Sequence, residues 1–315
     1  MRFGFYMPNS GPTGQPDALA EIARRGDQLG FYCLVSPDHV IEPRSISSAY
    51  PYTVAGDFSG SARSDGEWLE VITTLSFLAG VTQQIRLVTS VMIVPYRNPI
   101  LTAKMLATVD VVSKGRLVVG VGVGWMEEEF LALDTPPFAE RGAVTNEYLR
   151  AYKELWTSDD PTFEGEFCRF SNLSFLPKPV QNPHPPIWVG GQSRRAIRRA
   201  AELGDAWHPL GAIPATPLEP EELAADLSRL CRYAEKAGRD PATVEVALKA
   251  PLYDPGLTTG GGRRRFGGSA EQVLQDIQTY ADLGVGYLIF DFRAHDLGRT
   301  LERMEWFAQE VMAKA

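Results

Sequence analysis

Short apolar segments alternate with longer amphipathic segments along almost the whole chain of 315 residues. The short segments are nearly continuous runs of apolar residues, which is typical of parallel strands covered by helices on both faces. About eight strand–helix units follow one another, which is the number that closes an α/β barrel. We therefore predict an α/β fold, a (β/α)8 TIM barrel, in a single domain over residues 1–315. The expected strands are Phe3–Met7, Tyr32–Ser36, Ile85–Val94, Arg116–Val121, Ile187–Gly190, Ala206–His208, Thr243–Ala250 and Tyr287–Asp291.

Three insertions interrupt this alternation, after the second strand, after the fourth strand and before the last helices. Residues 41–66 are rich in Ser, Gly and Pro, and an insertion of this length is usually functional or disordered. Residues 159–183 contain a segment typical of a β-hairpin, and residues 254–268 are glycine-rich. The expected helices are Asp17–Leu29, Glu67–Gly80, Ile100–Val112, Asn146–Trp156, Arg194–Leu203, Glu219–Ala237, Ala270–Leu283 and Arg299–Met312.

The charge of the chain excludes several classes of partner. A net charge of −8 and a pI of about 5.2 argue against a nucleic-acid or anionic-membrane surface. No apolar run approaches the ~18–20 residues that span a bilayer. The segment from Met1 to Tyr6 is typical of a strand rather than of a secretion signal. Three cysteines without metal-ligand spacing predict neither a disulfide framework nor a metal site, so we expect a cytoplasmic protein that acts on small molecules.

The stretch from Pro185 to Ser193 is typical of a phosphate site. A short apolar strand ends at Gly190 and Gly191, and a helix begins directly after Gln192 and Ser193. A helix N-terminus presents unpaired N–H groups and the positive end of the helix dipole, and glycines let a ligand approach the backbone. The alternative interpretation is an ordinary tight turn between a strand and a helix.

Asp38 and His39 follow the second predicted strand, at the end of the barrel where active sites lie. A histidine suits proton transfer near neutral pH, and the adjacent aspartate suits orienting it or bonding a ring nitrogen of a ligand. Alternatively, Asp38 caps a turn and His39 is merely exposed.

Two further strand ends are candidates for contact with a flat cofactor. Ser90 and Val91 lie near the end of the third strand, where backbone would approach a bound ring. The fourth strand ends in alternating glycines that lead to Val123, Gly124 and Trp125, and glycines leave room for a ring against the main chain. The alternatives are a buried strand for the first and a bulge, with Trp125 filling the core, for the second.

Several other residues have both a functional and a structural interpretation. His208 either lines the pocket or packs, and Asp291 with Arg293 either binds substrate or forms a simple salt bridge. The run Arg263–Arg265 is either solvated or clamps an acidic ligand. The acidic turn Glu127–Glu129 follows the glycine-rich strand. Because the chain shows no nucleophile elbow and no metal-ligand spacing, we expect a bound cofactor to supply the difficult chemistry.

At the level of whole motifs, the chain resembles the bacterial luciferase-like monooxygenase superfamily, and within it the oxidoreductases that use the deazaflavin coenzyme F420. The resemblance spans nearly the whole chain with its motifs in order. FMN-dependent relatives share the barrel and the glycine segments. The segments on which the resemblance rests are Phe3–Phe5, Asp38-His39, Lys114–Trp125, Phe138–Gly142, Pro185–Ser193, Leu203–Trp207 and Gly268–Val273.

This resemblance implies a TIM barrel, usually dimeric, with an isoalloxazine-type ring at the C-terminal ends of the strands. His39 would donate a proton or orient the substrate beside the ring, together with Asp38. The peptide bond between Ser90 and Val91 would be the family's non-prolyl cis peptide, pressed behind the ring. The implied cofactor-binding residues are Asp38, Ser90, Val91, Val123, Gly124, Gly190, Gly191, Gln192 and Ser193.

One departure from the resemblance bears on the substrate. The sugar-phosphate dehydrogenases of this branch carry an active-site glutamate after the glycine segment, where this chain has Trp125. A sugar phosphate is therefore not expected, and a bulkier, more apolar substrate is. We expect residues 41–66 to form a lid over the barrel mouth, and Trp125, Tyr50 and His208 to line the substrate pocket.

The sequence thus predicts a homodimeric oxidoreductase that transfers hydride between coenzyme F420 and a small organic substrate. The first alternative is an FMN-dependent monooxygenase that inserts oxygen into an organic substrate. The second is a protein that binds a flavin or deazaflavin without catalysis.

Overall fold

The computed structural model describes residues 1–58, 67–251 and 263–315. Its parallel strands form a closed barrel in the order β3-β2-β1-β11-β10-β9-β8-β5, and the pairing of β3 with β5 completes the circle. The short β4 continues β3 and also pairs with β5, so the two together occupy one of eight positions. The predicted (β/α)8 barrel is therefore confirmed. The barrel strands are β1 Arg2–Tyr6, β2 Cys33–Ser36, β3 Arg86–Thr89, β4 Met92–Ile93, β5 Leu117–Gly122, β8 Ile187–Gly190, β9 Ala206–His208, β10 Glu245–Pro251 and β11 Tyr287–Asp291.

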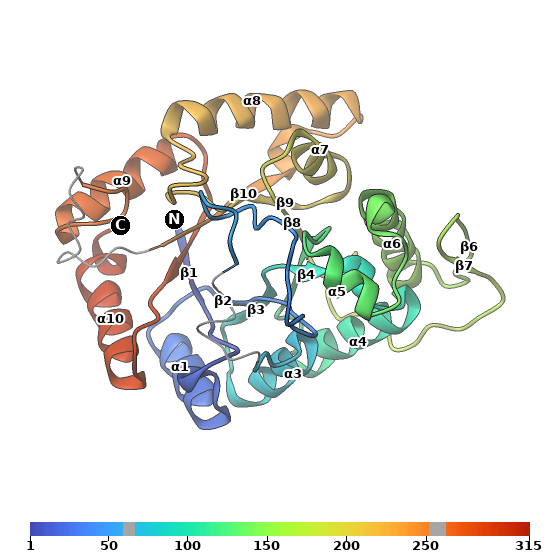
Figure 1. Cartoon of the computed structure of the whole chain (residues 1–315), viewed down its shortest axis with the longest axis horizontal. Helices are drawn as coiled ribbons and strands as arrows, with labels where there is room; N and C mark the ends of the chain where they lie inside the picture. The colour runs from blue at the N-terminus through green and yellow to red at the C-terminus, as the bar shows by residue number, and fades with distance from the viewer. Residues whose placement is uncertain (59–66, 252–262) are drawn as a thin grey trace.

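Helices surround the barrel and cover its outer face (Figure 1). Ser193, Ser269 and Asp296 precede three of them, and each side chain accepts a hydrogen bond from a backbone N–H of the first turn. Short 3-10 helices lie at Pro12–Gly14, Val94–Tyr96, Phe138–Glu140, Pro241–Thr243 and Met312–Lys314. The α-helices are α1 Pro16–Gln28, α3 Val71–Val81, α4 Pro99–Val112, α5 Glu127–Ala132, α6 Arg141–Thr157, α7 Arg194–Leu203, α8 Pro220–Lys236, α9 Ala270–Asp282 and α10 Leu297–Glu310.

The apolar side chains separate into two layers, as the alternating directions of strand residues require. The outer layer packs between the strands and the helices, and it contains Leu34, Leu87 and Val119. The inner layer fills the barrel, and it contains Val35, Val88 and other residues from neighbouring strands. The barrel is therefore a packed core rather than a pore, and ligands must bind at its mouth.

The third predicted strand is interrupted. Instead of one strand over Ile85–Val94, β3 ends at Thr89 and β4 begins at Met92, with a cis peptide bond between Ser90 and Val91. This is the non-prolyl cis peptide that the resemblance implies. A methyl group on Gly120 of β5 would overlap the carbonyl oxygen of Thr89, so glycine is required where the two strands meet.

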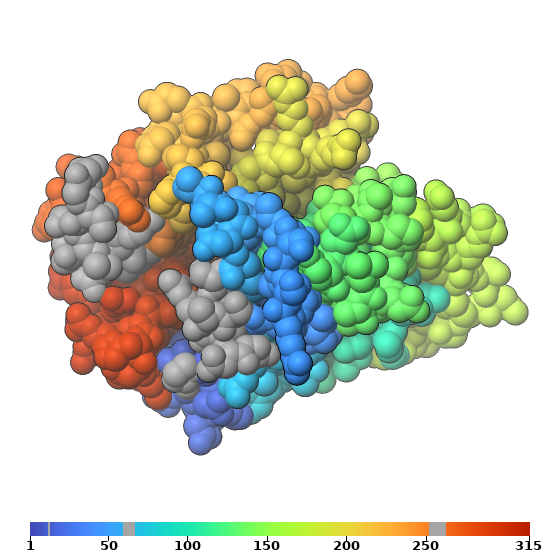
Figure 2. Space-filling view, in the orientation of Figure 1, coloured from blue at the N-terminus to red at the C-terminus, as the bar shows by residue number. Residues whose placement is uncertain are grey.

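The insertions have different structures. The predicted hairpin is confirmed, because β6 Phe163–Glu164 pairs antiparallel with β7 Arg169–Phe170. Residues 41–58 cross the middle of one face of the molecule, beside α5 and α6 (Figure 2). The remainder of that insertion, 59–66, and most of the glycine-rich loop before α9 lie outside the described residues. Within the described part of the chain, no helix is long and apolar enough to cross a membrane.

Candidate active site

A cavity of about 1310 Å³ opens at the C-terminal end of β4, β5 and β8. Residues of α6, of α7 and of the insertion after β2 complete its wall. The structure therefore brings together most of the cofactor-binding residues expected from the sequence. Those that line the cavity are Val91, Val123, Gly124, Gly190, Gly191, Gln192 and Ser193, with Trp125 beside them.

The junction between β8 and α7 has the geometry of an anion site. Gly191 has a φ of 98°, a conformation that favours glycine, and its carbonyl oxygen accepts a hydrogen bond of 2.8 Å from the indole of Trp207. The hydroxyl of Ser193 caps the N–H of Ala196 at 3.2 Å. The side-chain amide of Gln192 donates to the carbonyl of Leu210, so it holds the following loop. What remains for a ligand is the set of N–H groups that a helix start leaves unpaired.

Arginines dominate the charge of this cavity. Six of them line it against two carboxylates, Glu140 and Glu202. The buried Arg199 donates to Asn146 at 2.5 Å, and burial lowers its pKa to about 10. The excess of positive charge suits a ligand with several anionic oxygens. The six are Arg141, Arg150, Arg194, Arg195, Arg198 and Arg199.

Three of these arginines are available to a ligand. Arg150, Arg194 and Arg195 are exposed, and none of their guanidinium groups has a hydrogen bond or ion pair with another described residue. Arg198, in contrast, pairs with Glu202 at 2.6 Å on the surface of α7. The unpaired arginines therefore flank the helix start that presents the free N–H groups.

The glycines of the cavity floor make room for protein side chains as well as for a ligand. A Cβ atom on Gly122 would lie 2.6 Å from a methyl group of Val91, and one on Gly190 would lie 2.9 Å from the other methyl group. Gly124 has a φ of 83°, and a Cβ there would lie 2.6 Å from the ring of Phe130. Val91 thus bulges into the cavity between two glycines, directly after the cis peptide.

His208 lies behind this bulge and is buried, with 4% of its surface exposed. Its Nε2 is 2.9 Å from the hydroxyl of Ser90, and its Nδ1 is 2.5 Å from the carbonyl oxygen of Ala247. Burial lowers the pKa of His208 to about 4, so the ring is neutral near pH 7. Nδ1 must then donate to the carbonyl, and Nε2 accepts from Ser90. His208 does not line the cavity described above. It supports the cis peptide through its hydrogen bond with the hydroxyl of Ser90.

Asp38 has a structural environment. One carboxylate oxygen accepts from the backbone N–H of Ile93 at 2.9 Å, and the two oxygens receive a bidentate pair from Arg97 at 2.8 and 2.7 Å. Arg97 also reaches Glu70 at 2.8 Å. Asp38 is 4% exposed, and among the described residues it forms no hydrogen bond with His39. The aspartate therefore ties the end of β2 to β4, and its carboxylate is already occupied.

Glu129 is the carboxylate that orients His39. Nδ1 of His39 is 3.1 Å from one oxygen of Glu129, which also accepts from Tyr96 at 2.9 Å. The other oxygen accepts from the N–H groups of Val40 and Ile41 at 2.7 and 3.2 Å. Burial alone would raise the pKa of Glu129, but His39 and these hydrogen bonds lower it overall. The ionised carboxylate holds a proton on Nδ1 and leaves Nε2 as the reactive nitrogen.

Sequence reasoning missed this role of Glu129. The available indication was the run of three acidic residues directly after the glycine-rich strand, at the barrel end where sites lie. In the structure this run forms the first turn of α5.

An aromatic cluster covers His39. Phe58 and Trp68 lie 5.3 and 4.9 Å from the imidazole, measured between ring centroids. Tyr50 and Trp125 lie 5.0 Å from each other, and Phe58 lies 5.1 Å from each of them. Two of the four, Tyr50 and Phe58, come from the insertion after β2, so its described part lies over the candidate site. This placement puts apolar rings around His39, and the role of residues 41–66 as a lid stays a prediction.

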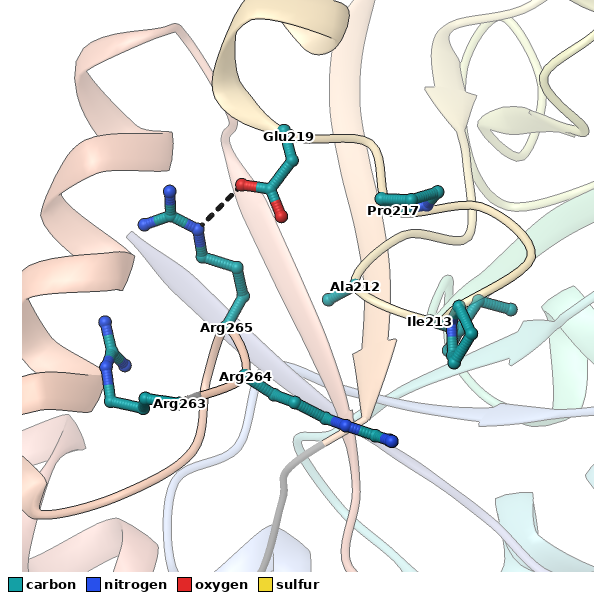
Figure 3. A pocket seen from close by; sticks show the side chains of 8 residues that line it. Ala212, Ile213, Pro217, Glu219, Arg263, Arg264 and Arg265 are labelled. Carbon is teal, nitrogen blue, oxygen red and sulfur yellow. Dashed lines mark hydrogen bonds and ion pairs between the residues drawn. The ribbon is translucent and has the colours of Figure 1, made fainter. Parts of the chain in front are cut away.

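The arginine run before α9 stabilises the fold. Arg263 and Arg265 pair with the buried Asp276 at 2.6 and 3.1 Å, and Arg265 also pairs with Glu219 at 2.9 Å. The three arginines and Glu219 line a cavity of about 490 Å³. Figure 3 shows Arg264 directed away from Arg263 and Arg265. Because Glu219 precedes α8 and Asp276 lies in α9, the pairs connect the two helices.

The barrel, its cis peptide and the glycine-rich cavity agree with a match to a family model. The model of the family described as luciferase-like monooxygenase matches residues 1–253, and the chain belongs to this family. An uncharacterized protein of Mycobacterium tuberculosis is 34% identical over 313 residues, which cover 96% of this chain and 97% of the relative. The chain is also 38% identical over 141 residues to an FMNH(2)-dependent dimethylsulfone monooxygenase of Pseudomonas putida, covering 44% and 38% of the two chains.

Among solved structures, the fold is similar to the coenzyme F420 dependent tetrahydromethanopterin reductase of Methanopyrus kandleri. The TM-score is 0.75 at 15% identity, with 99% of this chain and 98% of the other covered. The family therefore makes the protein a luciferase-like oxidoreductase or monooxygenase, with relatives and structural neighbours that use FMN or F420. Within the described residues, no group of three or more His, Cys, Asp or Glu side chains could hold a metal ion.

Proposed function

We propose that the protein is an oxidoreductase that transfers hydride between the deazaflavin coenzyme F420 and an organic substrate. The observation that carries this proposal is the arginine-rich cavity at the start of α7. Coenzyme F420 carries a phosphodiester and a tail of glutamate residues beyond its ring, whereas FMN ends in a single phosphate. The exposed side chains of Arg150, Arg194 and Arg195 provide more positive charge than a single phosphate would pair with. This charge suits an extended polyanion.

The residues present fit such a cofactor in three respects. The backbone from Gly190 to Ser193 would hold the phosphodiester at the N-terminus of α7. Arg150 and Arg195 would pair with carboxylates of the tail. Val91, which projects between two glycines, would support the ring.

When bound, the cofactor supplies or accepts the hydride, and the chain manages the proton. Glu129 fixes Nδ1 of His39, so Nε2 exchanges a proton with the substrate atom next to the carbon that gains or loses hydride. The aromatic cluster around His39 excludes water and packs against the apolar part of the substrate. Trp125 lies in this cluster and also lines the cavity, so it connects the substrate side with the cofactor side.

A titration with each cofactor tests the proposal. We expect the purified protein to quench the fluorescence of F420 with a micromolar or tighter Kd and to bind FMN more weakly. The double variant Arg150→Gln/Arg195→Gln should weaken F420 binding about ten-fold or more, because two charge-assisted hydrogen bonds are lost, and should affect FMN less. The matched control is Arg232→Gln, an exposed arginine of α8 that does not line the cavity. A preference for FMN in the wild-type protein would contradict the proposal.

An FMN-dependent monooxygenase is the second candidate function. The similarity to the dimethylsulfone monooxygenase favours it, since that relative is 38% identical over the matched 141 residues. Oxygen consumption coupled to turnover with reduced FMN would distinguish it from hydride transfer with F420.

A further inference from the structure

Two cations share one aromatic ring at the barrel mouth, on strands that the candidate site does not use. Lys249 of β10 places its Nζ 4.3 Å from the centroid of the Tyr6 ring. The guanidinium carbon of Arg293, which follows β11, lies 4.1 Å from the same centroid. Tyr6 ends β1, which lies between β11 and β2 in the barrel. Because His39 follows β2, the cation pair lies beside the strand end that carries the potential proton donor.

These charges do not cancel. Arg293 makes a bidentate pair with Asp291, with distances of 2.9 Å to one carboxylate oxygen and 2.6 Å to the other. The half-buried ammonium of Lys249 has no hydrogen bond or ion pair with any residue that the structure describes. The neighbouring His208 is neutral. One positive charge is therefore left over, and a partly buried ammonium without a hydrogen-bond or ion-pair partner is costly to maintain.

The aromatic cluster continues into this cation pair. Tyr50 contacts Trp125 and Phe58, and its phenol interacts electrostatically with Arg293 and Tyr6. Tyr50 therefore lies between the aromatic rings around His39 and the cation pair.

We propose that Lys249, supported by Arg293, binds the carboxylate of an unsaturated organic acid that is the substrate. This inference rests on the proposed oxidoreductase function and names the substrate class of the same site. The single excess charge matches a monoanionic carboxylate better than a dianionic phosphate ester. Lys249 fixes the acid end, and the apolar remainder lies under the aromatic cluster next to His39.

Binding of three small probes to the purified protein tests this assignment, by calorimetry and without turnover. Cinnamate carries the carboxylate, cinnamamide is its neutral analogue, and phenyl phosphate carries a dianion. We expect the wild-type protein to bind cinnamate about ten- to hundred-fold more tightly than cinnamamide, the range typical of hydrogen bonds to charged groups. Equal binding of these two probes would overturn the inference. Tighter binding of phenyl phosphate than of cinnamate would overturn the assignment to a carboxylic acid.

Substitutions assign the preference to one side chain. Lys249→Gln should abolish the preference for cinnamate over cinnamamide, and Lys249→Arg should retain most of it because the charge is kept. The matched control is Lys236→Gln, which removes the same charge from an exposed position on α8. If the preference survives in Lys249→Gln, the inference is wrong.

The pH dependence of cinnamate binding gives a second readout. Burial and the nearby Arg293 lower the pKa of Lys249 to about 8, against the opposite effect of Asp291. Among the described residues, the other groups that face Lys249 are Tyr6, whose pKa is raised to about 12 by burial, and the neutral His208. Cinnamate affinity should therefore be highest below about pH 8 and fall as Lys249 loses its proton, and Lys249→Gln should not show this fall.

Cofactor binding separates this inference from the function on which it rests. Lys249→Gln should bind F420 as tightly as the wild-type protein, because Lys249 does not line the arginine-rich cavity. If the wild-type protein binds cinnamate selectively but binds no F420, the proposed function fails while the anion site stands. If F420 binds and cinnamate does not, only the substrate class is wrong.

Discussion

Replacement of His39 by alanine is expected to lower kcat by about 10²- to 10⁴-fold, the usual contribution of a positioned acid or base. In the proposed function the imidazole transfers the proton, and Glu129 orients it at 3.1 Å from Nδ1. Cofactor affinity should stay within about two-fold, because His39 does not line the arginine-rich cavity. Steady-state kinetics and a cofactor titration on the same preparation measure both quantities. Added imidazole should restore part of the lost activity.

Glu129→Gln provides the companion measurement. A glutamine keeps the shape but not the charge, so the imidazole loses the partner that holds a proton on Nδ1. We expect a smaller loss of kcat than in His39→Ala, together with a change in the pH profile of kcat. A wild-type kcat in His39→Ala would remove the imidazole from the mechanism. A wild-type pH profile in Glu129→Gln would remove the positioning role of the carboxylate.

Asp38→Ala is expected to lower the free energy of unfolding by about 3–5 kcal/mol, because removing one partner of a buried ion pair leaves the other charge buried and unpaired. Asp38 is buried, and its removal leaves Arg97 with Glu70 alone and the N–H of Ile93 without its acceptor. Urea unfolding followed by circular dichroism measures this change.

The control is Asp17→Ala, which removes an exposed carboxylate from the first turn of α1 and should cost less than about 1 kcal/mol. Asp38→Asn should fall between the two, because an amide oxygen can still accept from Ile93. An Asp38→Ala protein with unchanged stability and a much lower kcat would restore the catalytic role that the sequence suggested for this residue.

The fold was predictable because the barrel depends on a repeated local pattern. Buried parallel strands and amphipathic helices leave signatures that do not depend on distant contacts. The break in the third strand had no such signature, since Ile85–Val94 is a continuous run of strand-forming residues. Helix α5 was missed because its six residues are too few and too acidic for a periodic apolar face.

The candidate site was predictable only where it depends on backbone. The glycine junction after β8 is a local feature, and it lines the cavity as expected. The partner of His39 is not local, because Glu129 lies 90 residues further along the chain. Asp38 was the obvious partner in the sequence, yet its carboxylate pairs with Arg97 while His39 contacts Glu129. His208 was placed at the right strand end, and only the packing shows that it supports Ser90.

Two adjacent glutamates connect the insertion after β2 to His39. Glu128 accepts hydrogen bonds from the N–H groups of Ser47 and Ser48 at 2.6 and 3.0 Å, and Glu129 holds His39 from the same turn of α5. Outward movement of residues 47 and 48 would break their hydrogen bonds to Glu128 and disturb the turn of α5 that orients the imidazole. The imidazole of His39 would then lose the orientation that Glu129 gives it. In the proposed function, proton transfer by His39 would therefore depend on the position of residues 47 and 48.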